Sequence, residues 1–297
     1  MSTVLLLVPD FAIILCGFGL NRFTRWGKHF WEGLEKLIYY VLFPALLFHS
    51  IAKNRIDFAL AGPALSMTCI VVLSGIFLAF AGKWLLKPDA RLFASVFQAA
   101  FRFNSYIGLA IIGRLHGEPG IAAFGLIIGV AVPIANIASV WVLAHHAEKG
   151  LFAELVRNPL LLATLGGLLY NLSGFGLPEP VQMLLGRMGG ASIPLGLLAV
   201  GAALRVKKAG HVAVLGSYMV GVKLLVLPLV AIFGARALGV TGNYFVAVVV
   251  LAACPVATSA YVLANRMGGD GESVALLVSV STLLGMLTIP FWLGVMQ

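Results

Sequence analysis

The sequence predicts an all-α membrane protein with ten transmembrane helices in two inverted repeats of five helices each. Three observations support this fold class: the composition, the spacing of apolar segments, and a similarity between the two halves of the chain. Hydrophobic residues make up 61% of the 297 residues and charged residues only 10%, and the mean hydropathy is +1.02. A soluble chain of this length would carry far more polar surface.

Ten apolar segments follow one another with short connections between them. They cover residues 4–21, 33–52, 62–86, 93–115, 120–143, 159–176, 187–204, 211–235, 244–265 and 273–296. The longest polar connection lies between the fifth and sixth segments, so we expect no soluble domain. The expected organisation is a first repeat over 1–143, a short cytoplasmic linker over 144–158 and a second, inverted repeat over 159–297.

The basic residues are distributed unevenly between alternate connections. Twelve belong to one set, Arg22, Arg25, Lys28, Lys83, Lys87, Arg91, Lys149, Arg157, Arg205, Lys207, Lys208 and Arg266, and five to the other, Lys53, Arg55, Arg114, Arg187 and Arg236. Cytoplasmic loops of membrane proteins carry the excess of Lys and Arg. We therefore expect a multi-pass protein of the inner (plasma) membrane with both termini outside the cytoplasm. This pattern also accounts for the net charge of +9 without a nucleic-acid partner.

The two halves of the chain share a sequence pattern. Residues Gly113–Ile128 match Asn265–Val280 with an offset of 152, and both stretches begin with an Arg-x-x-Gly turn. Pro44 in the second segment and Pro194 in the seventh are 150 residues apart. Because each half contains an odd number of spans, the second copy enters the membrane in the opposite direction. The pattern predicts two inverted repeats.

Arg102 and Asn104 lie in the middle of the fourth apolar segment. A charged side chain at the bilayer centre costs from about 2.5 to more than 10 kcal/mol, so such a group faces a cavity or a partner. One interpretation is that the guanidinium binds a substrate carboxylate. The other is that it pairs with backbone carbonyls freed by a helix break. An amide and a cation at this depth favour an anionic substrate.

The ninth segment is interrupted at Pro255, in the place that corresponds to the fourth. Interrupted spans in equivalent places of two halves are typical of transporters with a site between them. Polar residues beside each interruption can cap a half-helix or bind a substrate oxygen. Lys223 in the eighth segment can serve as a second cationic arm or bond to the backbone at a break. The predicted substrate-binding residues are Arg102, Asn104, Ser105, Tyr106, Gly108, Lys223, Pro255, Thr258 and Ser259.

Signals of catalysis and of cofactor binding are missing from the sequence. The three cysteines have no CxxC spacing, and no HExxH string or Ser/His/Asp grouping occurs. We therefore predict no enzyme, no catalytic residues, no metal and no cofactor. Asp10, Glu32 and Glu35 lie at or near segment ends. Without a deep carboxylate, uniport or export driven by the membrane potential is favoured, at about 2.3 kcal/mol per charge per 100 mV.

Five strings resemble the auxin efflux carrier family, which includes the plant PIN-type carriers and many bacterial organic-anion carriers. They are YYVLFPALLFHSIA (39–52), FRFNSYIGLAIIGRLHG (101–117), RNPLLLATLGGLLYNLSG (157–174), ACPVATSAYVLANRMGGD (253–270) and STLLGMLTIPFWL (281–293). The resemblance covers essentially the whole chain. It implies broken fourth and ninth helices that cross near the midplane, as in bile-acid symporters. It also implies an elevator movement against a scaffold of the first, second, sixth and seventh helices.

The resemblance further implies a carrier for small organic anions, such as carboxylates or auxin-like acids, that works by alternating access and can form a homodimer in the lipid bilayer. One position departs from the family pattern: Ala110 stands where relatives often have a proline. The expected break in the fourth helix must then rely on Asn104, Ser105 and Gly108. The alternatives are a sodium-coupled organic-anion symporter, a channel and a receptor that does not transport.

Overall fold

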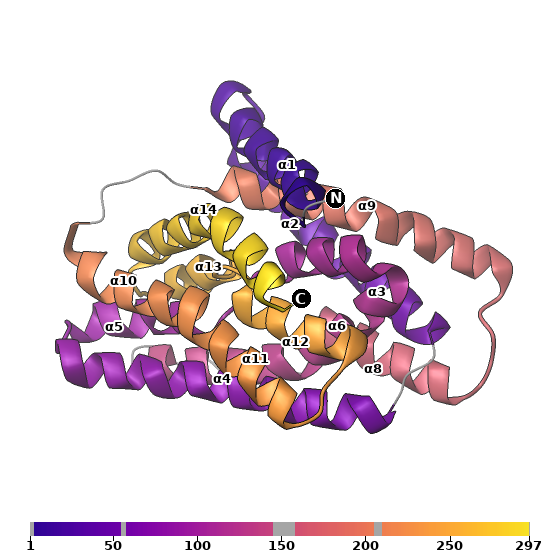
Figure 1. The fold of residues 1–297 in the computed structure, drawn as a ribbon. Helices are drawn as coiled ribbons and strands as arrows, with labels where there is room; N and C mark the ends of the chain where they lie inside the picture. The colour runs from indigo at the N-terminus through magenta and orange to yellow at the C-terminus, as the bar shows by residue number, and fades with distance from the viewer. Residues whose placement is uncertain (1–2, 55–57, 145–157, 205–209, 297) are drawn as a thin grey trace.

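The computed structural model describes residues 3–54, 58–144, 158–204 and 210–296, and every regular element in those ranges is a helix (Figure 1). The first half contains α1 (Thr3–Phe23), α2 (Gly27–Leu37), η1 (Ile38–Leu42), α3 (Phe43–Lys53), α4 (Phe58–Leu86), α5 (Ala90–Val96), η2 (Phe97–Ala100) and α6 (Ser105–Ala144). The second half contains α8 (Pro159–Leu172), α9 (Glu179–Ala203), η3 (Gly210–Val212), α10 (Ala213–Gly221), η4 (Val222–Val226), α11 (Leu227–Ala237), α12 (Gly242–Ala253), α13 (Ser259–Arg266) and α14 (Gly271–Val295). The all-helical prediction is confirmed.

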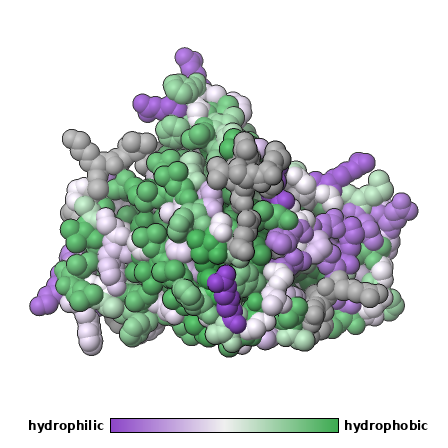
Figure 2. Space-filling model, in the orientation of Figure 1, coloured by the Kyte–Doolittle hydropathy of each residue, from purple (hydrophilic) through white to green (hydrophobic). Residues whose placement is uncertain are grey.

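Much of the described chain is long and apolar enough to cross a membrane. Six helical stretches meet that criterion: Gly27–Lys53, Ala59–Leu86, Ala90–Leu143, Glu179–Ala203, Ala213–Ala237 and Gly271–Val295. Two shorter apolar helices, α8 and α12, accompany them. Figure 2 shows hydrophobic side chains over much of one face of the molecule. These features are those of a multi-pass helical membrane protein.

Several helix boundaries differ from the sequence-based ranges; α9, for example, begins at Glu179 rather than 187. Two of the differences have a local reason. Helix α2 begins at Gly27, before the expected 33, because its first turns are amphipathic. The exposed Lys28 and Glu32 form a 3.4 Å ion pair there, and a hydropathy window does not register such a segment. Helix α8 ends at Leu172, before the expected 176, and Gly174 adopts φ 73°, a left-handed conformation that favours glycine at helix ends.

Several helix starts are set by capping side chains. The Asp89 carboxylate accepts a 2.9 Å hydrogen bond from the Leu92 N–H at the start of α5. The Asn158 amide oxygen accepts from Leu160 N–H at 3.0 Å, and Pro159 occupies the first turn of α8, where its missing N–H is not needed. These residues begin helices at points that the sequence alone determines.

The helices pack in two groups that share a boundary. One group contains α1, α2, α3, α8 and α9, with α1 along α9 and α3 along both α8 and α9. The other contains α4, α5, α6 and α10 to α14, with α12 against α6 and α11 against α4 (Figure 1). A side chain at Gly17 or Gly201 would collide with the backbone carbonyl of Leu198 or Ile14, respectively, so glycine permits the close α1–α9 contact.

Both interruptions expected from the sequence are present. The chain leaves helical geometry between Ala100 and Ser105, and again between Ala253 and Ser259. The two irregular segments touch: the Asn104 N–H donates a 2.8 Å hydrogen bond to the Pro255 carbonyl. The first break therefore forms without a proline at position 110.

The Arg-x-x-Gly turns also change the chain direction. Gly117, inside the range of α6, has φ 58° and ψ −149°, so α6 consists of two helices joined at a kink. In the second half Gly268 has φ 71° between α13 and α14. Residues 145–157 of the expected linker, and the basic residues Arg55, Lys149, Arg157, Arg205, Lys207 and Lys208, lie outside the described residues.

Candidate functional site

Asn104 caps the helix that starts after the first interruption. Its side-chain Oδ1 accepts hydrogen bonds from the Tyr106 N–H at 3.0 Å and the Ile107 N–H at 3.4 Å. These two donors determine which side of the amide is oxygen. The Nδ2 of Asn104 is buried and has no hydrogen-bond partner in the described part of the chain. A buried donor without a partner is costly, which makes this amide a candidate ligand contact.

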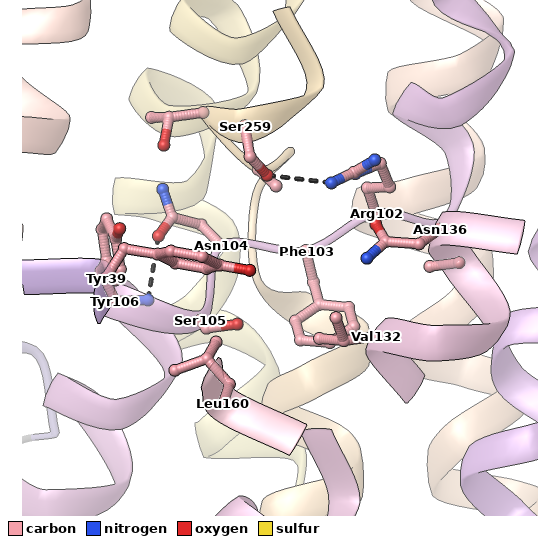
Figure 3. A pocket seen from close by; sticks show the side chains of 13 residues that line it. Tyr39, Arg102, Phe103, Asn104, Ser105, Tyr106, Val132, Asn136, Leu160 and Ser259 are labelled. Atoms are coloured by element: carbon pink, nitrogen blue, oxygen red, sulfur yellow. Dashed lines mark hydrogen bonds between the residues drawn. The ribbon is translucent and has the colours of Figure 1, made fainter. Parts of the chain in front are cut away.

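Arg102 connects the two interruptions through its side chain. It is 9% exposed, and its Nη2 donates a 3.0 Å hydrogen bond to the Ser259 Oγ at the start of α13 (Figure 3). Its Nη1 lies 3.4 Å from the Gln98 Oε1. Both of these acceptors are neutral, and a guanidinium group can bind a carboxylate through charge-assisted hydrogen bonds. Gln98 in turn donates to the Ala260 carbonyl at 3.1 Å, which adds a second link between the segments.

Two helix N-termini meet beside these residues. Helix α6 begins at Ser105 and α13 begins at Ser259. The N-terminus of a helix carries a partial positive charge, and its first N–H groups have no partner within the helix. Together with the guanidinium, this arrangement makes the local field positive. Such a site is suited to an anion.

A cavity of about 130 Å³ lies at this meeting point. Figure 3 shows Arg102, Asn104 and Ser259 around it, with Phe103, Val132 and Leu160 forming apolar parts of its wall. The complete lining is Tyr39, Arg102, Phe103, Asn104, Ser105, Tyr106, Val132, Ala135, Asn136, Leu160, Ala257, Thr258 and Ser259. Polar donors at one side and apolar groups at the other are the composition of a small-molecule pocket.

Six of the nine predicted site residues line this cavity. They are Arg102, Asn104, Ser105, Tyr106, Thr258 and Ser259. Sequence reasoning missed Tyr39, Val132 and Leu160, which line the cavity. The neighbouring Tyr40 is 61% exposed and does not line it. The signal for Tyr39 was its place at the start of the string 39–52, which resembles the family.

The other three predicted residues, Gly108, Pro255 and Lys223, do not line the cavity. At Gly108 a side chain would collide with the Phe124 ring and approach the Cys254 sulfur to 3.2 Å, so this glycine allows α6 to pack on the second interruption. Pro255 presents its carbonyl to Asn104. Lys223 is fully buried and donates to the backbone of α12. The sequence left two roles open for Lys223, a second cationic arm of the substrate site or a bond to the backbone at a break. The structure shows the bond to the backbone.

A second, larger cavity of about 870 Å³ lies between α1, α2, α9 and α13. It contains charges of both signs, from Arg22, Lys28, Glu32 and Glu35. Glu35 lies within the apolar stretch Gly27–Lys53, one helical turn before Tyr39. No cluster of His, Cys, Asp or Glu that could hold a metal ion occurs among the residues described.

The fold and the site define the class of protein: a multi-pass membrane protein whose interrupted helices enclose a small polar cavity, which is the architecture of a transporter. Residues 145–293, half of the chain, match the family model described as "Membrane transport protein". The chain belongs to this family, to which the resemblance in the sequence pointed. The family and the names of its relatives indicate a membrane transporter rather than an enzyme.

Named relatives are similar along nearly their whole length. An "Uncharacterized transporter" of Methanothermobacter thermautotrophicus is 24% identical, with 95% of this chain and 94% of the relative covered. A "Putative malonate transporter" of Rhizobium meliloti is 24% identical, with 96% and 92% covered. The "Uncharacterized transporter YfdV" of Escherichia coli K12 is 20% identical, with 97% and 96% covered.

Proposed function

We propose that this protein is a carrier for small organic anions, in particular carboxylates, that works by alternating access. The observation that carries the proposal is the buried, unpartnered Nδ2 of Asn104 beside the Arg102 guanidinium in one cavity. A carboxylate has two oxygens, and these two donors can bind them at the same time. A buried cation at membrane depth is costly, and a bound anion offsets part of that cost.

The surroundings of these donors favour the same ligand class. Each helix N-terminus acts as roughly half a positive charge, and two of them end at the cavity. The wall formed by Phe103, Val132 and Leu160 suits a short carbon skeleton. A cavity of about 130 Å³ favours a small acid over a large one. The name of the Rhizobium meliloti relative, a malonate transporter, agrees with a carboxylate.

The packing supports the inverted repeat and the elevator arrangement that the proposal includes. If the halves are related by a two-fold axis, the first span corresponds to the sixth and the second to the seventh. The contact of α1 with α9 then has its counterpart in the contact of α8 with α3, and both contacts are extensive. These four helices form the scaffold of the proposed mechanism, and the group that contains both interruptions moves against them.

The proposal keeps the organisation expected from the sequence. Its two repeats cover 1–143 and 159–297, the connecting linker lies in the cytoplasm, and both termini lie on the extracytoplasmic side of the inner (plasma) membrane. A homodimer remains part of the hypothesis.

Ligand-induced stabilisation of the purified protein tests the site. A ligand at 100 times its Kd stabilises the native state by about 2.7 kcal/mol. We expect one or more acids in a panel of mono- and dicarboxylates to raise the Tm of the wild type and not that of Arg102→Ala. Arg236→Ala is the matched control, because Arg236 is exposed on α11, near the Phe245 ring, away from the cavity. An acid that stabilises wild type and Arg102→Ala equally would exclude the guanidinium from the site.

Flux measurements in proteoliposomes separate the alternatives. A carrier shows saturation and counterflow of the stabilising acid, a channel shows neither, and a receptor binds without flux. A sodium symporter requires a sodium gradient for uptake, whereas uniport of the anion responds to the membrane potential alone.

A further inference from the structure

Lys223 lies in an unusual local structure. It belongs to η4, a single π-helical turn from Val222 to Val226 between α10 and α11. Its side chain is fully buried, and the Nζ donates to the Leu251 carbonyl at 3.0 Å and to the Ala252 carbonyl at 2.8 Å. Both acceptors belong to the last turn of α12, directly before the second interruption.

These two carbonyls lack their helical donors for identifiable reasons. The Leu251 oxygen would accept from residue 255, but Pro255 has no N–H. The Ala252 oxygen would accept from residue 256, but the Val256 N–H donates instead to the Ser281 Oγ at 3.1 Å. The break therefore exposes two oxygens at the C-terminus of a helix, which carries partial negative charge. The ammonium of Lys223 lies against both oxygens.

Hydrogen bonding alone does not require a charged donor in this protein. Pro228 removes the helical donor of the Leu224 carbonyl in the same way, and there the neutral indole Nε1 of Trp292 donates instead, at 2.7 Å. The ion pairs of the described residues join Lys28 to Glu32, Lys53 to Glu118 and Arg114 to Asp10, and none of them includes Lys223. The cation at α12 is therefore balanced by backbone dipoles.

Unwound backbone carbonyls and half-helix C-termini are the groups with which carriers coordinate sodium. We propose that the Lys223 ammonium is a tethered cation that occupies a monovalent-cation site at the second interruption. The protein then needs no sodium at this position, and shortening the side chain opens the site to sodium or to a small alkylammonium ion. This inference concerns a cation and not the transported anion, so it goes beyond the proposed function.

Thermal unfolding of purified variants tests the inference without any substrate. Wild type, Lys223→Ala and Lys223→Met are compared in sodium, potassium, choline and propylammonium chloride at equal ionic strength. We expect a wild-type Tm that does not distinguish these salts. Lys223→Ala should unfold several degrees lower in choline and recover a saturable part of that loss in sodium or propylammonium. Lys223→Met should be equally low without recovery, because its side chain fills the space and lacks the charge.

Three results would overturn the inference. The first is a Tm of Lys223→Ala that is the same in every salt, and the second is a specific sodium effect on the wild type. The third comes from Lys223→Gln, which keeps a neutral donor and is the variant to use if Lys223→Ala does not fold. A Gln variant as stable in choline as the wild type would mean that no cation is needed. Lys83→Ala, an exposed change on α4, controls for the loss of one positive charge.

Discussion

The two interruptions have opposite chemistry although they touch each other. The first, between Ala100 and Ser105, has no proline and presents donors to a cavity. The second, at Pro255, releases carbonyl acceptors into the protein interior, where Lys223 satisfies them. A proline break removes a backbone donor and leaves a carbonyl acceptor that another donor must satisfy, which at Pro255 is the Lys223 ammonium. At the first break the side chain of Asn104 caps the helix with its oxygen and keeps an unpartnered Nδ2 donor, which can bind an anion.

Hydrogen bonds connect the two interruptions in three places. The Asn104 N–H donates to the Pro255 carbonyl, the Arg102 guanidinium to Ser259, and the Gln98 amide to the Ala260 carbonyl. A ligand held at the first segment is therefore coupled to the position of the second. Changes to the donors of the first break should affect binding directly, whereas changes at Pro255 should affect the movement of the second break or folding.

The largest expected effect follows from Arg102→Ala. A hydrogen bond to a charged group contributes about 1.5–3 kcal/mol, so loss of the guanidinium contact together with its positive charge lowers affinity by about a hundredfold or more. Transport of the acid found in the stabilisation screen should fall to background, while the protein still folds. Initial counterflow rates and the Tm without ligand are the two measurements. Near-normal transport by a folded Arg102→Ala variant would rule out a role of the guanidinium in binding the carboxylate.

Asn104→Asp tests the first break with less disturbance. Aspartate is as good a helix cap as asparagine, so the start of α6 should be retained. The buried Nδ2 donor, however, is replaced by a negatively charged oxygen that repels an anion. We expect affinity to fall by about ten- to a hundredfold with a Tm close to that of the wild type. Equal affinities of Asn104→Asp and wild type would show that the amide only caps the helix.

Pro255→Ala tests the second break. Alanine restores an N–H that can donate to the Leu251 carbonyl in competition with Lys223, and this change favours a continuous helix from α12 to α13. The free energy of unfolding should change by about 1 kcal/mol or less, whereas transport should fall by about tenfold. Rates and Tm are measured on the same preparation. Unchanged transport kinetics would show that the interruption at Pro255 has no role in the transport mechanism.

The smallest effect is expected for Ser281→Ala. The Ser281 Oγ accepts from the Val256 N–H, and its loss leaves one buried donor without a partner. The variant should be destabilised by about 1 kcal/mol, with ligand affinity and transport per folded molecule unchanged. A chemical or thermal unfolding series checks the first part and a binding isotherm the second. A selective loss of affinity would mean that the contact between Val256 and Ser281 also positions the residues that line the cavity.

Much of the site was predictable because its residues are out of place in an apolar segment. Arg102 and Asn104 are costly at that depth, so their presence pointed to a cavity before any contact was known. Lys223 is also a cation in an apolar segment, but it contacts backbone carbonyls and does not line the cavity. A buried cation can face a ligand or a backbone carbonyl, and the sequence around Lys223 is equally compatible with both.

The sequence by itself determined the all-helical membrane class, the positions of most helices and the two interruptions, because hydropathy, proline and capping residues act within a few positions of the chain. Only the tertiary structure decided which side chains meet. The π-helical turn over Ile38–Leu42 shifts the phase of the helix, so no 3.6-residue period could select Tyr39 over Tyr40 for the cavity. Likewise, the contact of Lys223 with α12 joins residues almost thirty positions apart, and helix packing alone determines such a pair.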